Sequence, residues 1–595
     1  QVVITPFGLP YAAAQSFIRA DTTFLLFLFV ILAGTSVRFY GLDWGLPYHF
    51  HTDERFVAVS AERLRTAEFI AQLTDQPYFF LYPPFISYLL IGLVNLVSFF
   101  HPFSPTEPAG GTLYYLMGRG ITACFGSATL VVIYLLGKRL YTESTGLLAA
   151  AFLAFSVLHV RDSHFYFPDV PFTFFVLLVV LFAAKIAQEG RIQSYIFSGI
   201  FAGVGMATKQ TAVMTLPVIV TAHAIAMFKH QEASRATYKK VIFSGRFWGL
   251  LLLPMFVAAL TFLLLDPFVL INPRRFLQMS QILEQFVRGI NQPHWTFQFT
   301  GTTISYWFTN LLYFGMGPLL EFVSLVGLLW AVVQRKTADV LVLAFLVPYF
   351  YFVGEGYMKF IRYAIPLLPF LCLLGARFLL NLWEISTAKI TRLAVGGLAA
   401  AVIVSSGLYT LAYLNIYRQE DVRIQAAKWI HRQVPAASTI LIDSSAATPL
   451  IGSRFFRPEF FSRTVVENDM HVTKNDYFNI KILNLLTNPP RPPLPPDWWQ
   501  TYLAERLADV DYIIMSDEHY EQYSHRPETY PVVNKFYRDL LQGELGYQLI
   551  KSFKTYPSLL GHPLNDDRAE LTFRLFDHPK IWIFKRDDVV NTGIS

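Results

Sequence analysis

Cysteine and charged residues are both scarce in this sequence of 595 residues. Its 2 cysteines, Cys124 and Cys372, lie within apolar runs, which argues against a disulfide framework. Hydrophobic residues make up 54% of the chain and charged residues only 15%, with a mean hydropathy of +0.40. Because the core of a water-soluble protein cannot absorb so much apolar surface, the composition predicts a polytopic α-helical membrane protein.

Several common functional motifs are absent as well. The sequence contains no internal repeat, no P-loop, no glycine fingerprint for dinucleotides and no Cys or His set with metal-ligand spacing. The net charge is +6, and the basic residues are dispersed through short loops between apolar runs. This dispersion argues against nucleic acid as a partner.

The first apolar run, residues 22–37, carries no charge. With Arg38 and Phe39 it makes about 18 residues, roughly 27 Å of helix, which is close to the thickness of a hydrocarbon core. It lacks a small-residue cleavage site, so we expect a retained membrane segment and not a signal peptide. Together with this run, about eleven spans are predicted, the others at residues 113–137, 146–160, 170–187, 193–208, 210–228, 247–265, 318–334, 338–353, 362–380 and 393–414.

The charges between these runs predict the topology. The loop 229–246 carries five basic residues and a single acid, which is typical of a cytoplasmic loop. The run 84–101 must then lie along the membrane or re-enter it without crossing, since otherwise Asp53 and Asp169 face opposite sides. This arrangement predicts an amino terminus inside and a carboxy terminus outside. We expect the segment 303–314, rich in Tyr and Trp, to lie in the outer interface.

The composition changes at about residue 415, which predicts two domains: a transmembrane domain over residues 1–415 and a soluble, extracytoplasmic α/β domain over residues 416–595. Helical spacing around Ile424 to Ile430 is followed by short strand patterns. The strands are expected at residues 439–442, 510–515 and 580–585. The proline-rich stretch Pro489 to Pro496 predicts a rigid polyproline II loop, or a ligand for a peptide-binding module.

The predicted topology gathers polar residues at the outer ends of the spans, in and around the loops 40–112, 161–169 and 266–302. The acid pair Asp53-Glu54 follows the first span, and carboxylates at a membrane surface are costly unless they serve chemistry. Basic residues on the outer side oppose the usual charge bias. They are therefore suited to bind an anion, such as a lipid phosphate at headgroup level.

Short motifs follow one another along this part of the chain: His51-Thr52-Asp53-Glu54, Tyr82-Pro83-Pro84, Asp169-Val170-Pro171, Lys209 within Ala-Thr-Lys-Gln-Thr, and Arg362-Tyr363-Ala364-Ile365-Pro366. Their order resembles the GT-C superfamily, and within it the protein O-mannosyltransferases and the bacterial lipid A aminoarabinose transferases. The resemblance covers about residues 20–415. It implies an integral enzyme of a bacterial plasma membrane that takes a sugar from a polyprenyl phosphate on the extracytoplasmic side, with the first-loop acid as catalytic base.

The residues present suit this reaction. A lipid phosphate is already a good leaving group, so one base and a set of cations suffice, whereas glycoside hydrolysis needs two carboxyl groups. Adjacent helical side chains point about 100° apart, so we expect different roles for the two acids: Asp53 is the base, and Glu54 orients it or binds the acceptor. We predict Asp53, with Glu54 and Asp169, as the catalytic group; Lys209, Arg274, Arg275 and Arg362 as ligands of the donor phosphate; and His51, His164 and Tyr363 as residues that orient or bind the acceptor.

Each of these residues also has a simpler interpretation. The acid pair can solvate a surface helix, Asp169 can cap the next span, and Lys209 can extend its amine from the membrane to water. The arginines can contact headgroups or the interface, and the histidines can be hydrogen-bonded surface residues. A divalent metal (Mg, Mn or Ca) held by Asp53 and Asp169 is a further alternative, although we expect no obligatory metal.

Two other functions fit the same composition. A lipid-carrier transporter or flippase would use a similar cationic cavity, but it would also place ionisable residues near the middle of the membrane and pair broken helices. A non-catalytic subunit of a membrane assembly would retain the fold without needing the acid pair. For a transferase, the partners are the lipid-linked sugar, membrane lipids and an acceptor that is a protein, a lipid or a glycan.

Overall fold

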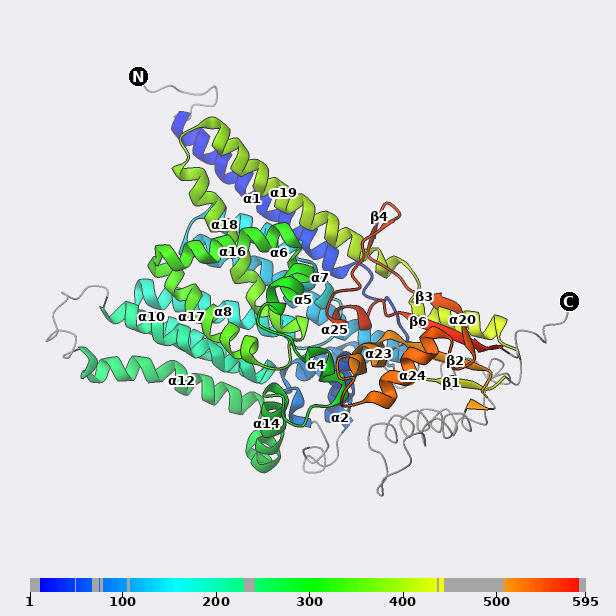
Figure 1. Cartoon of the computed structure of the whole chain (residues 1–595). Coiled ribbons are helices and arrows are strands. Elements are labelled where there is room, and N and C mark those ends of the chain that lie inside the picture. Colours follow the sequence, from blue (N-terminus) through cyan, green and yellow to red (C-terminus); the bar gives the residue numbers. More distant parts are fainter. Residues whose placement is uncertain are drawn as a thin grey trace.

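The computed structural model describes residues 11–48, 50–66, 74, 79–103, 108–228, 241–435, 438–443, 507–508 and 510–587. A large helical part comes first, and a small sheet with its own helices follows it (Figure 1). Most of the loop that we predict to be cytoplasmic, residues 229–240, lies outside the described residues. The proline-rich stretch 489–496 also lies outside them.

Long apolar helices dominate the first part, as the composition predicts for an integral membrane protein. Among the described residues, eight helical segments are long and apolar enough to cross a membrane, or nine if a pair bent by 119° forms one span. The eight are Thr22–Phe39, Gly111–Leu140, Asp169–Glu189, Gln210–Phe228, Gly245–Leu265, Thr337–Glu355, Ile361–Ile385 and Lys389–Gln433. The bent pair joins Trp307–Met316 to Pro318–Gln334.

Shorter apolar helices complete the bundle. They are α4 (Phe85–Phe100), α6 (Glu143–Ala154) and α9 (Ile192–Thr208). The eleven predicted spans correspond to the eight long segments, the bent pair, α6 and α9. That each of these crosses the membrane, and that α4 does not, stays a prediction.

One predicted span differs in the structure, and one segment is packed in a way that the sequence did not indicate. The run 146–160 is not one helix, because the chain breaks at Phe155 and Ser156 between α6 and the short α7 (Val157–Asp162). The placement of the segment 303–314 in the outer interface stays a prediction. Its Trp307 is fully buried in the protein. It begins the π-helical turn Trp307–Leu312, which packs its ring against Phe350 with a centroid distance of 5.5 Å.

Small residues allow the helices to pack closely. The best example lies between α5 (Pro108–Leu140) and α6, where a Cβ added to Gly146 would lie 2.3 Å from the carbonyl oxygen of Tyr134. Without a hydrophobic driving force between helices in lipid, such close backbone contact is a main source of association.

The second part contains a four-stranded sheet in the order β1-β2-β6-β3. Strand β1 (Ile440–Ile442) runs parallel to β2 (Tyr512–Ser516), whereas β6 (Ile581–Arg586) is antiparallel to both β2 and β3 (Tyr547–Phe553). The predicted strands 439–442, 510–515 and 580–585 are thus confirmed, but β3 was not predicted. Its side chains from Gln548 to Lys551 are exposed, so it lacks the apolar pattern of a core strand.

Helices cover both faces of this sheet. The predicted helix around Ile424 is confirmed as α20 (Val422–Gln433), whose Val422, Ala426 and Ile430 pack on one face. Helices α23 (Asp517–Ser524) and α24 (Pro531–Gln542) contribute Tyr523 and Tyr537 to the core on the other face. The strands β1, β2 and β6 therefore bury side chains on both sides, as an α/β layer requires, whereas most of β3 is exposed.

The end of the chain returns to the helical part. Asp577 accepts hydrogen bonds from Arg161 Nε at 2.8 Å, from the Tyr413 hydroxyl at 3.0 Å and from the Tyr417 hydroxyl at 3.0 Å. Phe573 belongs to the main core of the bundle. The sheet-containing part is thus held by a buried network against one end of the helices. We call this end, where α1 (Tyr11–Phe39) finishes and α8 (Asp169–Glu189) begins, the site face.

Candidate active site

A cavity of about 550 Å³ opens at the site face. Segments far apart in the sequence form its walls: the Tyr82-Pro83 turn, the start of α8, the turn after α9, helices α14 (Pro273–Val287) and α17 (Thr337–Glu355), and the 3-10 turn Ile361–Leu367. The charged residues that line it are Asp169, Lys209, Glu284, Arg288 and Arg362. Much of the remaining wall is apolar, so the cavity combines three cations and two acids with a surface suited to hydrocarbon.

Asp53 lies at the edge of this cavity. One carboxylate oxygen accepts a hydrogen bond from the Tyr82 hydroxyl at 2.6 Å, and the other pairs with Arg362. Both partners line the cavity, whereas Asp53 itself lies behind them with 16% of its side chain exposed. The carboxylate therefore adjoins the cavity and still reaches solvent, which is the position that a base between two substrates requires.

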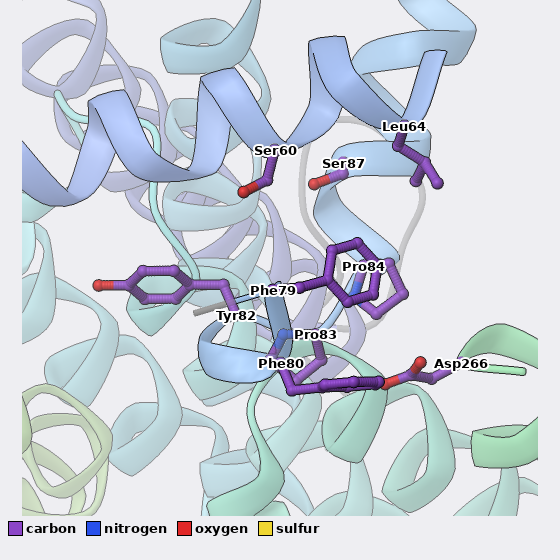
Figure 2. Close-up of a pocket in the computed structure, with 9 residues that line it drawn as sticks. All are labelled: Ser60, Leu64, Phe79, Phe80, Tyr82, Pro83, Pro84, Ser87 and Asp266. Atoms are coloured by element: carbon purple, nitrogen blue, oxygen red, sulfur yellow. The ribbon is translucent and has the colours of Figure 1, made fainter. Parts of the chain in front are cut away.

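Tyr82 remains a proton donor to Asp53. Burial, with the nearby Asp169 and Tyr363, raises the pKa of its phenol well above the usual range. Behind it, a small cavity of about 10 Å³ lies between Phe80, Pro83 and Asp266. In Figure 2 the Tyr82 hydroxyl points away from Asp266, with the proline turn between them. The phenol is thus directed toward Asp53 by a packed turn.

Asp169 and Lys209 form a second ion pair in the wall. The Lys209 amine lies 2.5 Å from a carboxylate oxygen of Asp169. Asp169 opens α8, and Lys209 ends α9, where a 3-10 turn begins. The simpler interpretation of Asp169 as a helix cap is not what the structure shows, since its side chain faces Lys209 instead. The amine also lies 5.1 Å from the ring centre of Tyr363, where a cation and an aromatic ring attract each other.

Arg362 connects this wall to Asp53. Its guanidinium lies 4.9 Å from the ring centre of Phe360 and 5.9 Å from that of Tyr363. The turn that carries it is held from outside the bundle: the backbone N–H of Ile361 donates to Glu570 Oε2 at 3.3 Å. The end of the chain therefore positions Arg362, a support that the sequence did not indicate.

Glu54 has a different environment from Asp53, as the predicted angle between them requires. It is fully buried and forms a two-pronged ion pair with Arg119, with both N···O distances at 2.8 Å. Arg119 also donates to the carbonyl oxygens of Leu42 and Trp44, at 2.7 and 2.8 Å. Glu54 is thus placed to hold the loop after α1 against α5, and contact with an acceptor is not supported by its burial. The sequence reasoning did not assign Arg119 a role.

The two predicted histidines also lie outside the cavity. His51 Nδ1 accepts the backbone N–H of Glu54 at 3.4 Å, and the ring stacks on Phe576 with a centroid distance of 4.0 Å. Burial and several nearby arginines hold the pKa of His51 well below its usual range, so the ring is neutral. His164 is buried between the carbonyl oxygens of Val160 and Tyr40, each at 2.8 Å. Both are placed to orient the chain rather than to touch a substrate.

The structure does not bring Arg274 and Arg275 to the cavity. They stand in the first turn of α14, where Asn272 accepts the backbone N–H of Arg275 at 3.2 Å, and neither lines the cavity. The residue that does line it is Arg288, directly after the same helix, paired with Glu284 at 2.6 Å. The sequence alone does not show which end of α14 faces the cavity, so it could not distinguish Arg288 from Arg274 and Arg275.

The arrangement of carboxylates does not favour a metal between Asp53 and Asp169. Each of them is paired with a cationic side chain, Arg362 in one case and Lys209 in the other. In the part of the chain that the structure describes, no three His, Cys, Asp or Glu side chains gather as a metal site. We therefore describe no step through a metal.

Comparison with known proteins relates the fold to membrane glycosyltransferases. Residues 118–262 match the family model of dolichyl-phosphate-mannose-protein mannosyltransferases. A search of curated proteins found no match. The archaeal oligosaccharyltransferase AglB from Archaeoglobus fulgidus, in complex with an inhibitory peptide and a dolichol-phosphate, is 11% identical, with a TM-score of 0.50 over 87% of this chain and 72% of that chain.

Two further solved structures are similar over different extents. ArnT from Cupriavidus metallidurans, bound to undecaprenyl phosphate, is 14% identical over 84% of this chain and 94% of that chain, with a TM-score of 0.44. The S. cerevisiae protein O-mannosyltransferase Pmt1-Pmt2 complex, bound to the sugar donor, is 18% identical over 43% of this chain and 34% of that chain, with a TM-score of 0.32.

The different environments of the two adjacent acids predict different effects on stability. Glu54→Gln leaves a buried Arg119 without its counter-charge, so we expect a loss of about 3–5 kcal/mol in the free energy of unfolding. Asp53→Asn removes a partly exposed pair and should cost about 1 kcal/mol or less. Thermal unfolding of the purified protein in detergent compares the two variants. Equal losses would show that Glu54 has no special structural role.

Proposed function

We propose that this chain, an integral membrane protein with the GT-C fold, is a glycosyltransferase. It moves a hexosyl unit from a polyprenyl-phosphate donor to a hydroxyl of a protein, lipid or glycan, on the extracytoplasmic side of a bacterial plasma membrane. The observation that carries this proposal is the position of Asp53 beside a cavity that is lined by Lys209, Arg288, Arg362 and many apolar side chains.

The cavity suits the donor. Lys209, Arg362 and Arg288 supply positive charge for a phosphate. Leu283, Val287 and other apolar side chains of α14 and α17 can face the first units of a lipid chain. The dolichol-phosphate in the AglB structure and the donor named by the matching family model support a lipid phosphate as the leaving group here.

The reaction follows from this placement. An acceptor hydroxyl approaches Asp53 from solvent, and its oxygen attacks the anomeric carbon as the bond from that carbon to the phosphate oxygen breaks. The proton passes to Asp53, and the electron pair leaves with the polyprenyl phosphate, whose extra negative charge the cations stabilise. Attack from the side opposite the phosphate inverts the anomeric carbon. No general acid is needed, because the departing phosphate does not have to be protonated.

Other residues position these groups. Tyr82 holds one oxygen of Asp53, and Asp169 holds the Lys209 amine where it faces Tyr363. Glu54 and Arg119 set the start of α2 (Thr52–Thr66), on which Asp53 stands. These supports reduce the motion of the base and of the cations, and precise placement of reacting groups lowers the barrier.

Replacement of the base tests the catalytic role. In Asp53→Asn the amide cannot take the acceptor's proton, so we expect transfer from a polyprenyl-phosphate sugar to fall by about 10²- to 10⁴-fold. Transfer is measured with radiolabelled donor in membranes, against Asp43→Asn as a matched control in the same loop. Transfer at the wild-type rate by Asp53→Asn would exclude Asp53 as the base. A folded wild type that transfers from no donor would favour the transporter or subunit alternatives.

The cations of the cavity should matter more than those at the start of α14. Lys209→Met removes a charge beside the departing phosphate, so we expect kcat to fall by about 10²-fold or more. Arg288→Gln should weaken donor binding by roughly 10-fold, seen as a higher KM. Arg274→Gln is the control on the same helix and should leave both constants unchanged. If Arg274→Gln has the larger effect, the donor binds elsewhere.

Labelling tests the membrane side of the site. In a Cys124→Ala background, a cysteine at Ser234 should resist an impermeant thiol reagent in intact cells, because the basic loop is expected in the cytoplasm. A cysteine at the exposed Ile290 should react. Detergent-opened cells are the control, in which both should react. The opposite pattern would place the cavity on the cytoplasmic side.

A further inference from the structure

A second cavity, of about 560 Å³, lies between the ends of two membrane helices and a small hairpin. The end of α1, the end of α19 (Lys389–Leu414) and the hairpin β4–β5 (Ser558–Leu559 and His562–Pro563) form its walls. In Figure 1 this hairpin projects from the body of the molecule beside the ends of α1 and α19. The second cavity shares no lining residue with the candidate active site.

The tip of the hairpin is unusual for a protein that is surrounded only by water. Leu560 and Gly561 form a two-residue turn with φ of 50° and 84°. Such turns favour Asn, Asp or Gly at the first position, since a leucine side chain is strained at positive φ. Leu560 is nevertheless 92% exposed, so no packing within the described protein compensates for the strain. An apolar environment outside the protein would favour a leucine at this exposed position.

The bilayer supplies that environment. The apolar exposed faces of α1 and α19 lead directly to the cavity, with Leu32, Leu408 and Leu411 each about half exposed. Since both helices are long and apolar enough to cross a membrane, their ends lie where the hydrocarbon meets the headgroups. Asn415, next to the end of α19, donates to the Ser558 hydroxyl at 2.8 Å and holds the hairpin at this level.

A cation stands over the same cavity. Arg418 is exposed, and its guanidinium has no partner among the described residues. Leu414 and Leu559 line the same cavity, so the positive charge adjoins an apolar surface. A phospholipid has the complementary order of charge and hydrocarbon, with a phosphate that a guanidinium binds well.

We propose that this cavity binds a phospholipid through Arg418 and that the tip of the hairpin, Leu560, enters the surface of the membrane. The lipid phosphate pairs with Arg418, an acyl chain lies along Leu411 and Leu559, and Leu560 inserts beside it. The hairpin thereby ties the sheet-containing part to the bilayer on the site face. This proposal does not depend on the reaction at Asp53.

Retention of lipid tests the binding site. The full chain is purified in detergent, exchanged with 1-palmitoyl-2-oleoyl phosphatidylglycerol, washed, and examined by native mass spectrometry. We expect Arg418→Gln to retain at least about fivefold less phosphatidylglycerol than the wild type. Arg432→Gln is the control. Arg432 is also exposed but lies on α20, away from the lining of the second cavity, so this variant should retain the wild-type amount. Equal retention by Arg418→Gln and Arg432→Gln would overturn the site.

A second measurement separates insertion from folding. Leu560→Asn places Asn-Gly in the turn, which is the pair that such turns prefer, so the hairpin keeps its shape while the apolar tip is lost. We expect this variant to unfold at or above the wild-type temperature yet to retain less phosphatidylglycerol. A nitroxide on Leu560→Cys, in nanodiscs and with Cys124→Ala, should be reached by oxygen and not by a water-soluble nickel complex. The exposed Leu549 of β3 gives the aqueous reference. Equal access of the nickel complex at positions 560 and 549 would refute insertion.

Discussion

The buried pair of Glu54 and Arg119 is the interaction on which the arrangement of the site depends. It joins three separate segments: the start of α2, the middle of α5 and the loop after α1, whose carbonyl oxygens at Leu42 and Trp44 complete the arginine's hydrogen bonds. Glu54 also accepts the backbone N–H of Tyr166, ahead of α8, at 3.0 Å. A buried charge pair is tolerated only when its remaining hydrogen bonds are satisfied, and here they are. Asp53 is directed to the cavity because its neighbour is held so firmly.

The far end of the chain contributes as much to the site as the loops of the bundle do. Glu570 accepts the N–H of Ile361 and thereby supports the turn that carries Arg362, while Asn310 Nδ2 donates to the carbonyl oxygen of Arg568 at 2.5 Å. Asp577, which is also buried, accepts hydrogen bonds from Arg161, Tyr413 and Tyr417. The segment between the hairpin and β6 is thus part of the wall behind the candidate site. This explains why the sheet-containing part cannot be regarded as an independent attachment.

Two separate cavities are proposed to contact lipid, each with its own lining residues. Lys209, Arg288 and Arg362 line the cavity beside Asp53. Arg418 lines the second cavity, at the ends of α1 and α19. Both combine positively charged and apolar lining residues, the combination that a lipid with an anionic headgroup requires. They differ in their surroundings: the carboxylate of Asp53 adjoins the first, and the strained, exposed hairpin tip adjoins the second. The residues around the cavity beside Asp53 are suited to catalysis, and those around the second cavity are suited to attachment of the protein to the membrane.

The sequence by itself determined the class of protein, the approximate places of the long helices and the gathering of Asp53, Asp169, Lys209 and Arg362 at one face, whereas their pairing is visible only in the structure. Apolar runs of membrane length and the short strands β1, β2 and β6 are patterns of neighbouring residues, and such patterns can be recognised in the sequence alone. Even the separation of Asp53 from Glu54 follows from the angle between adjacent helical residues. The roles proposed for these residues remain predictions that the experiments above address.

Only the tertiary structure decided which end of α14 faces the cavity, so Arg288 replaces Arg274 and Arg275 there. It also decided that Glu54 is buried against Arg119, that the run 146–160 breaks, and that Trp307 turns into the core. The sequence likewise did not indicate the strand β3, the support of Arg362 by Glu570 or the second cavity at Arg418. All of these depend on contacts between segments tens to hundreds of residues apart, and the energy of such contacts comes from burial and pairing that no local pattern records.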